Sequence, residues 1–495
     1  MNIHIPEYSG VALSILTMAL FSEEEDLEYT VAAQMMMCVN AVVMEETARN
    51  KKDVPMKIDH RTAPRKPKTR WRHDEALACI KRDYLGDPFD TATPLMKDSG
   101  FLLHFRISRA RFERMFNDFK SSGFPFFRQQ AQAAEGTVGA SLEAKLLLPL
   151  KTLAYGVPPH TFQDYFQMSA TLARDCCVQF DLGIKTLYQR EYLRLPTKND
   201  LKSLSNLHKH HHGVDGMFGS LDCMHTFWKN CPKAWQGSFQ GKEGKPSIVL
   251  EAIGDYNLWF WHASYGYAGT MNDLNILNAS PFLQALVDGT FIEIEKSVVP
   301  YDIAGEQFQY CFILVDGIYP TYSRFVRSIP EPIGERQQRF SAWQESTRKD
   351  IERAFGVLQS KFQVLARPML QLNLIQIGNK VATCLILHNM CVSDRVMGDV
   401  NATYDPSFRV GEVVEEEVDQ PADLEAVQLR MGVVVADANN NGVGGGRIGV
   451  RNTPMDAQQG FTDKDRWNDL KSIEHHNRLI EALIDAQYTN KRQRK

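Results

Sequence analysis

The sequence has no C-x-x-C pair and no lysine or arginine before Arg49, and its one signal-like apolar run is short. The nine cysteines are scattered, a distribution that indicates neither a zinc ribbon nor a disulfide framework. A reducing compartment is therefore expected. The apolar run at residues 11–21 is too short to span a bilayer, lacks the basic start of a secretory signal and is followed by acidic residues. The sequence predicts no attachment to a membrane.

The overall charge is close to balanced, with a formal net charge of -4 at pH 7. This value does not indicate a nucleic-acid-binding protein, although a global charge says little about local patches. Basic residues gather at 61–72 and 491–495. Such clusters are typical of solvated tails or nuclear-localisation signals, and otherwise of phosphate contacts. Because 495 residues exceed what one hydrophobic core usually supports, two or three structural units with tails are expected.

Composition and periodicity divide the chain into five parts. Residues 1–73 are expected to be a poorly ordered tail with a basic linker, and residues 74–215 a helical domain. Strands and helices alternate in residues 216–395. Residues 396–451 are acidic and rich in Asn and Gly, which is typical of a disordered linker, and residues 452–495 recover helical periodicity before the basic end.

The helical region carries apolar residues at helical spacing, as at Phe112, Met115 and Phe116. The pattern breaks at Pro158 and restarts after Ser169, a residue type that favours a helix N-cap. Short helices separated by tight turns are compatible with a helix-turn-helix unit. From the pattern alone, a helical packing domain is an equally good interpretation.

The middle region is predicted to run in the order strand, strand, strand, helix, strand and, after a loop, helix. Segments 245–255 and 258–269 are predicted to form a β-hairpin. Segment 272–287 is predicted to be one helix opened near Asn272 or Asp273, and 309–320 a buried strand ended by Gly317 and Pro320. The segment 344–365 places an apolar residue at every third or fourth position, which predicts one face of a long helix.

Two acidic residues follow strand-like runs, Asp222 after "MFGSL" and Asp316 after "CFILV", and Glu352 lies beside the apolar face of the long helix. Acids at the ends of adjacent strands can converge, and a helix packed across that edge can supply a third. Three carboxylates suit Mg²⁺ or Mn²⁺, which prefer oxygen ligands. Two such ions about 4 Å apart would catalyse in-line displacement at a phosphodiester.

Each acid also has a plainer interpretation. An Asp after a strand is most often a turn or cap residue, and Glu352 can simply pair with Arg348 one turn earlier. Glu345 and Asp350 share the helix as rival third acids. Composition and periodicity alone leave these alternatives open.

Longer blocks of the sequence resemble a known family. These blocks are "GSLDCMHTFWKNCPKAWQGSFQG", "LEAIGDYNLWFWHASYGYAGTMNDLNILNASP", "LVDGIYPTYSRFVRSIPEP", "QESTRKDIERAFGVLQSKFQVLARP" and "ILHNMCV". Together, in order over about residues 100–395, they resemble the plant-transposon-protein branch of the PIF/Harbinger transposases, which are DDE-superfamily endonucleases. The resemblance does not extend to residues 1–70.

The resemblance implies a fold and a site. The expected fold is α/β, an RNase H-like core with a mixed five-stranded sheet flanked by helices, preceded by an all-helical, helix-turn-helix-like domain. The implied catalytic and metal-binding triad is Asp222, Asp316 and Glu352. In this sequence 35 residues separate Asp316 from Glu352. The family resembles other DDE enzymes in using this gap between the second and third acids, which disfavours Glu345.

The resemblance also implies partners. Residues 216–395 would be a DDE endonuclease domain that uses two Mg²⁺ or Mn²⁺ ions to cut and join double-stranded DNA at transposon terminal repeats and target sites. A Myb-like accessory protein, a homo-oligomeric active form and a nuclear location are expected. Candidate phosphate contacts in the helical region are Arg174, Lys185 and Arg190.

Other residues near the acids have two interpretations each. Asp273 is expected to cap its own helix and to support the site. His225 can contact phosphate or water near the metals, or pack structurally. Lys229 can contact phosphate, while Trp228 and Trp235 favour core packing over base stacking. The histidine-rich run 208–212 is expected to be a solvated loop rather than a soft-metal site.

Two other functions compete with a transposase. A domesticated relative would bind DNA or a protein partner and no longer cut, and terminal inverted repeats flanking the gene would argue against it. A nuclease acting on RNA through the same core is a weaker alternative. The intact set of three acids favours the cutting enzyme.

Overall fold

The computed structural model describes residues 71–86, 93–128, 139–291, 300–398 and 463–493. All of these residues belong to one compact unit of the chain. Most of the predicted N-terminal tail and the whole acidic linker lie outside them, as do the side chains of the terminal basic cluster. Of the helices in the described ranges, none is long and apolar enough to cross a membrane.

The chain before the sheet is helical in its described parts, as predicted. The helical segments are α3 (His73–Ile80), the π-helical η1 (Lys81–Leu85), α4 (Asp98–Phe105), α5 (Arg109–Ser121), α6 (Leu142–Tyr155), η2 (Pro159–Phe162), α7 (Gln163–Phe166), α8 (Ala170–Tyr192) and α9 (Lys198–His212). The predicted cap Ser169 accepts a hydrogen bond from the Leu172 amide and opens α8. A helix-turn-helix arrangement within this region stays a prediction.

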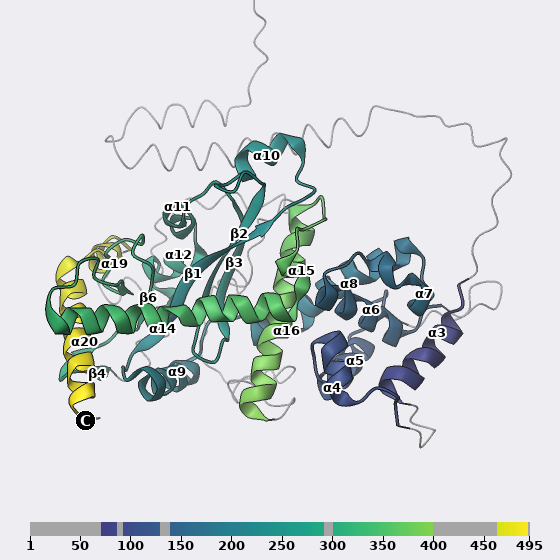
Figure 1. Ribbon diagram of the computed structural model, residues 1–495, viewed down its shortest axis with the longest axis horizontal. Helices are drawn as coiled ribbons and strands as arrows, with labels where there is room; N and C mark the ends of the chain where they lie inside the picture. Colours follow the sequence, from purple (N-terminus) through teal and green to yellow (C-terminus); the bar gives the residue numbers. More distant parts are fainter. Residues whose placement is uncertain (1–70, 87–92, 129–138, 292–299, 399–462, 494–495) are drawn as a thin grey trace, which may run out of the picture. The chain divides into compact units, whose positions relative to one another are not determined.

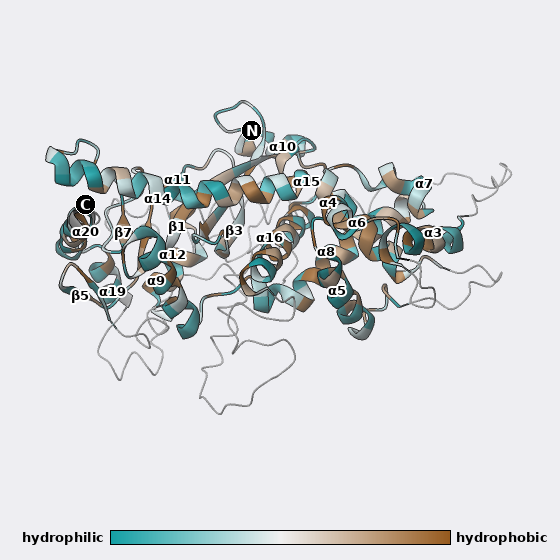
Figure 2. Ribbon diagram, turned by 60° about the horizontal axis from the view of Figure 1, so that its bottom comes forward, coloured by the Kyte–Doolittle hydropathy of each residue, from teal (hydrophilic) through white to brown (hydrophobic). Residues whose placement is uncertain are grey.

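Helix α8 joins the helical region to the sheet region, because it packs on both α6 and α16 (Leu374–Met397). The buried ammonium of Lys380 on α16 donates to the carboxylate of Asp181 on α8 across 2.9 Å. Buried apolar residues of α6, α8 and α16 belong to one hydrophobic cluster, and Figure 2 shows brown, apolar stretches on α6 and α16. A buried ion pair and an apolar interface therefore hold α8 against α16.

The described residues form one five-stranded sheet in the order β3-β2-β1-β6-β7. Its strands are β1 (Met217–Phe227), β2 (Ser247–Gly254), β3 (Phe260–Ala268), β6 (Phe312–Leu314) and β7 (Phe325–Val326). Strands β1, β2 and β3 are antiparallel neighbours, whereas β6 runs parallel to β1 and β7 parallel to β6. The expected mixed sheet flanked by helices is confirmed, as is the predicted β2–β3 hairpin.

Helix α14 (Gly334–Lys361) lies across one face of the sheet and contacts β1, β2 and β6 (Figure 1). Its buried Ile351, Phe355 and Leu358 follow the predicted apolar spacing. The other face is covered by α11 (Asp273–Asn278) and α12 (Pro281–Val287), where Phe282 packs on Phe218. Two short helices, α10 (Lys233–Phe239) and α15 (Gln363–Ala366), complete this part.

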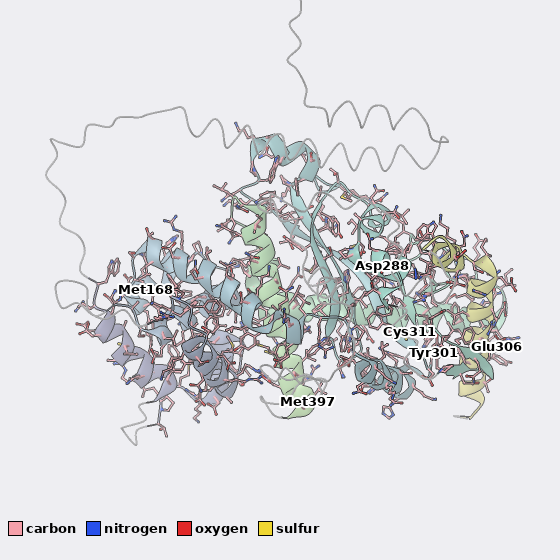
Figure 3. All side chains as sticks on the ribbon, turned by 180° about the vertical axis from the view of Figure 1, so that it is seen from behind. Met168, Asp288, Tyr301, Glu306, Cys311 and Met397 are labelled. Carbon is pink, nitrogen blue, oxygen red and sulfur yellow. The ribbon has the colours of Figure 1, made fainter. Side chains whose placement is uncertain are left out.

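The C-terminal helices return to the sheet region. They are α19 (Asp463–Leu470) and α20 (Ile473–Gln493), and they confirm the predicted helical periodicity there. Helix α20 packs on α14 and on the small hairpin of β4 (Tyr301–Ile303) and β5 (Glu306–Phe308). Figure 3 labels Tyr301 and Glu306 on that hairpin beside α20, and Arg478 Nε donates to Glu306 Oε2 across 2.7 Å.

Two predictions about elements near the acids are wrong. Asp222 does not end its strand, because β1 continues to Phe227 through pairing with β2 as far as Ser247. The segment 272–287 forms two helices, because the Ser280 hydroxyl caps a second helix that Pro281 opens.

Two further predictions about helices are also wrong. The long helix begins at Gly334 and ends at Lys361, so Phe362 and Leu365 lie beyond it. Histidines 208–212 form the last turn of α9 rather than a solvated loop, and His208 is fully buried. Helical geometry there is fixed by the capping box at the start of α9 and by Gly213 at its end.

Candidate functional site

Asp222 lies in the middle of β1 and faces helix α14. Ser220, two residues earlier, pairs with Gly254, whose open side is covered by Ile351 of α14. Side chains two residues apart on a strand share a face, so Asp222 points toward the same helix. Its Oδ1 accepts a hydrogen bond from the Cys223 amide at 2.8 Å. The strand thus fixes both the position and the direction of this carboxylate.

Arg348 on α14 joins Asp222 to Glu352. Its Nη1 lies 3.2 Å from Asp222 Oδ2, and its Nη2 lies 2.8 Å from Glu352 Oε1. The side chains of Arg348, Asp222 and Glu352 are 17%, 22% and 47% exposed, respectively. One guanidinium therefore contacts both acids at the edge of the α14–β1 contact, and the three groups together keep a net negative charge.

Asp316 continues the strand that pairs in parallel with β1. The last pair in the β1–β6 register is Ser220 with Leu314. Two residues further along each chain stand Asp222 and Asp316. Asp316 thus follows the end of β6 at the same number of residues past the last pair as Asp222 does on β1. The side chain of Asp316 is exposed.

The loop that follows Asp316 is held by Arg327. The guanidinium donates to the carbonyl oxygens of Tyr319 at 2.9 Å and Gly317 at 3.4 Å, and to the hydroxyl of Thr321. The Gly317 amide donates to Asp316 Oδ1 at 2.8 Å. Arg327 therefore fixes the turn from which the second acid projects.

Burial raises the pKa of Asp222 above its ordinary value. The Cys223 amide and the Arg348 guanidinium act in the opposite direction, while the negative charges of Glu352 and Asp273 raise the pKa further. Asp222 thus lies within electrostatic reach of two other carboxylates, one from α14 and one from α11.

Asp273 does not cap its helix, contrary to prediction. Asn272 is the N-cap of α11, since its side chain accepts a hydrogen bond from the Asn275 amide. Asp273 is the first residue of the helix, and its charge acts on Asp222. Its predicted supporting role at the site stays a prediction.

The described residues contain no group of three or more His, Cys, Asp or Glu side chains placed to hold a metal ion. Asp222 and Glu352 meet at one cation, but that cation is the guanidinium of Arg348. The donor set of carboxylate oxygens suits a hard divalent ion.

The rival acids on α14 have other surroundings. Asp350 is buried and pairs with His212 at 2.9 Å and with Arg353 at 3.0 Å. Glu345 is exposed. The partners of Asp350 come from α9 and from α14 itself, which indicates a structural role in joining the two helices.

Some of the other residues predicted to act near Asp222 lie away from its carboxylate. His225 is three residues along an uninterrupted register, so alternation turns it to the opposite face of β1, where its Nδ1 lies 3.2 Å from the Ser247 hydroxyl. Lys229 is exposed beyond the end of β1. Trp228 is buried and packs on the half-buried Trp235, as the packing interpretation expects.

The three candidate DNA contacts lie on α8. Arg174 and Arg190 are exposed. Lys185 is half-buried, and its Nζ donates to Asn379 Oδ1 of α16 at 2.9 Å. Lys185 therefore contributes to the α8–α16 contact, while a role in DNA binding stays a prediction for all three.

The sequence analysis did not identify Arg327 as the residue that holds the Asp316 turn, nor the contact of Arg348 with Asp222. The four-residue spacing of Arg348 and Glu352 did predict their ion pair on one helix. No signal in the sequence connects Arg348 with Asp222, because the two residues lie 126 positions apart and meet only through the packing of α14 on β1.

Residues 190–399 match the family described as plant transposon protein, which supports a transposon-derived origin for this part of the chain. The match covers the sheet, α14, α16 and the three acids. No curated protein and no solved structure matches the chain.

Proposed function

We propose that the chain is a DDE-type transposase and endonuclease that cuts and joins DNA phosphodiester bonds at transposon ends. The family match supports a transposase-related function. The observation that carries the proposal is the meeting of Asp222 and Glu352 at one guanidinium, with Asp316 two residues past the last β1–β6 pair, as Asp222 is on β1. The strand order, with the first acid on the first strand and the second after the fourth, supports an RNase H-like core.

Each acid has a distinct task in this proposal. Asp222 and Asp316 would hold divalent ions at positions set by the parallel strands, and Glu352 would complete the second site from α14. When bound, two Mg²⁺ or Mn²⁺ ions would supply an activated water or 3′-hydroxyl and stabilise the leaving oxygen. Arg348 would first release both carboxylates, and Arg327 would keep the Asp316 turn in place.

The proposed substrate and partners follow from the family resemblance. Duplex DNA with terminal repeats and a target site would be the substrate, and the helical region would contribute to its recognition. A Myb-like accessory protein, a homo-oligomeric active form and a nuclear location complete the proposal.

The test is cleavage of duplex DNA carrying the ends of the element, with Mg²⁺ or Mn²⁺ and the Myb-like partner. The variants Asp316→Asn and Glu352→Gln are expected to lose cleavage. Glu345→Gln is the matched control, because Glu345 is an exposed glutamate on the same helix, and it is expected to cut like wild type. Equal cleavage by wild type and Asp316→Asn would refute the assignment.

The second candidate is a domesticated protein that binds DNA without cutting it. The observation that favours it is the guanidinium of Arg348, which neutralises part of the acidic charge where a metal would bind. Absence of metal-dependent cleavage by a folded wild-type protein, with the partner present, would support this candidate.

A further inference from the structure

The connection between β1 and β2, residues 228–246, forms a projecting segment that we term the lysine arm. It contains α10 and lies past the ends of β1 and β2 (Figure 1). Trp228 at its base is 1% exposed and packs on Trp235 and Phe239 of α10. The arm therefore has a small aromatic core of its own, which faces inward.

Hydrogen bonds tie the base of the arm to the chain that follows α15. The indole Nε1 of Trp228 donates to the Gln371 carbonyl at 2.8 Å, and Asn230 Nδ2 donates to the Leu370 carbonyl at 2.6 Å. The Lys229 amide donates to the Met369 carbonyl at 3.0 Å. Three consecutive residues of the arm are thus fixed to a second segment, so the arm has a defined position relative to the sheet.

The outer surface of the arm is basic. Its lysines are Lys229, Lys233, Lys242 and Lys245, all exposed, and Glu243 is its one acidic residue. Within the described part of the chain, none of these lysines forms an ion pair. Lys245 lies with its ammonium 5.7 Å from the Phe227 ring centre. Exposed ammonium groups that lack protein counter-ions are available to anionic ligands.

Strand β1 leads from Asp222 to its end at Phe227, and the arm begins at the next residue. Lys229 is seven positions beyond Asp222. At about 3.3 Å per residue of extended chain, this spacing spans at most roughly 23 Å. Successive base pairs in duplex DNA are about 3.4 Å apart along the helix axis, so roughly 23 Å corresponds to about 7 base pairs.

We propose that the lysine arm binds the phosphate backbone of duplex DNA, starting within about 7 base pairs of the bond that the acids cut. This inference rests on the proposed function. The aromatic rings of the arm are buried or half-buried and pack on one another. The exposed groups that the arm presents to a ligand are therefore charged ammonium groups rather than stacking or apolar surfaces. Lysine ammonium groups bind phosphate as point charges, and the contact is therefore independent of base sequence.

The test uses the full chain and duplex DNA carrying the ends of the element, with affinity measured by fluorescence anisotropy over a range of KCl concentrations. The double variant Lys233→Gln with Lys242→Gln is expected to lower the slope of log affinity against log salt by about 1.8, since each phosphate contact contributes about 0.9. The loss should be equal for DNA of unrelated sequence.

The matched control is Lys198→Gln with Lys202→Gln on α9, which removes two exposed lysines and the same charge. This control is expected to keep the wild-type slope. An unchanged slope in the arm variant, or an equal fall in both variants, would overturn the proposal. Lysine-dependent binding of polyglutamate with unchanged DNA binding would instead identify an acidic protein as the partner.

The result is separable from the test of the proposed function. Glu352→Gln removes a catalytic acid and leaves the arm intact, so it should abolish cleavage and keep the wild-type salt slope. If wild type binds DNA with the arm-dependent slope but never cuts, the arm holds and the enzyme proposal fails. If wild type cuts DNA and the arm variant keeps the wild-type salt slope, the enzyme proposal holds and the arm proposal fails.

Discussion

Arg348 Nη1 lies 3.2 Å from Asp222 Oδ2, so a cation from α14 already occupies the carboxylate that the proposed metal needs. The same guanidinium holds Glu352 at 2.8 Å. A divalent ion and the guanidinium would compete for the same oxygens. The charge of Arg348 therefore opposes metal binding, even though it stabilises the site when no metal is present.

Arg348→Gln is expected to bind Mn²⁺ about tenfold more tightly than wild type, a change of about 1.4 kcal/mol. Isothermal titration calorimetry without DNA measures this directly. Arg353→Gln is the control, because Arg353 pairs with Asp350 on the same helix and should leave Mn²⁺ affinity unchanged. Weaker binding by Arg348→Gln would show that the guanidinium supports the metal site instead of competing with it.

Arg327→Gln is expected to lower kcat at least tenfold while KM for DNA stays close to the wild-type value. The guanidinium holds the carbonyls of Gly317 and Tyr319, and its loss would let the turn carrying Asp316 shift. Steady-state cleavage kinetics separate the two parameters. Arg327→Lys should recover part of the rate, because one ammonium can still donate to one carbonyl. A pure rise in KM would contradict this positioning role.

Much of the sheet was predictable from local pattern. Segments 245–255 and 258–269 are rich in β-formers and flank a short turn, so their hairpin follows from local rules. The start of α8 followed from the residue type at Ser169. The identity of the three candidate acids came from the family resemblance, since local pattern gave each acid a plainer interpretation.

Other parts of the fold have no local signal. Strand β7 is two residues long, Phe325–Val326, too short for any alternation to appear. The apolar run "MFGSL" stops at Asp222 and so predicts a strand end there, whereas pairing with β2 extends the strand to Phe227. The contact of Arg478 with Glu306 depends on how α20 packs. Such contacts are set by tertiary packing rather than by propensity.

Lys380→Met is expected to destabilise the protein by about 3–5 kcal/mol, because it leaves the buried Asp181 carboxylate without its partner. The two groups lie 2.9 Å apart between α8 and α16. Urea unfolding at pH 7 measures the loss. The double variant Asp181→Leu with Lys380→Met should recover most of it, since both buried charges are gone. A double variant as unstable as the single one would show that the pair does more than neutralise buried charge.

Acid is expected to destabilise the fold through His388, because burial lowers its pKa to about 3. Its Nε2 donates to the Leu258 carbonyl at 2.8 Å, a bond that the neutral ring makes. The folded state therefore binds fewer protons than the unfolded state between about pH 6.5 and pH 3, and stability falls as the pH falls through that window.

Between pH 7 and pH 5 the share of His388 in this loss is about 2 kcal/mol. His388→Gln keeps a donor for the carbonyl and cannot be protonated, so urea unfolding at the two pH values should show a pH-dependent loss smaller by that amount. The control is His160→Gln, because His160 is exposed and its substitution should leave the wild-type loss intact. If His388→Gln loses as much stability as wild type between pH 7 and pH 5, other buried groups drive the acid sensitivity.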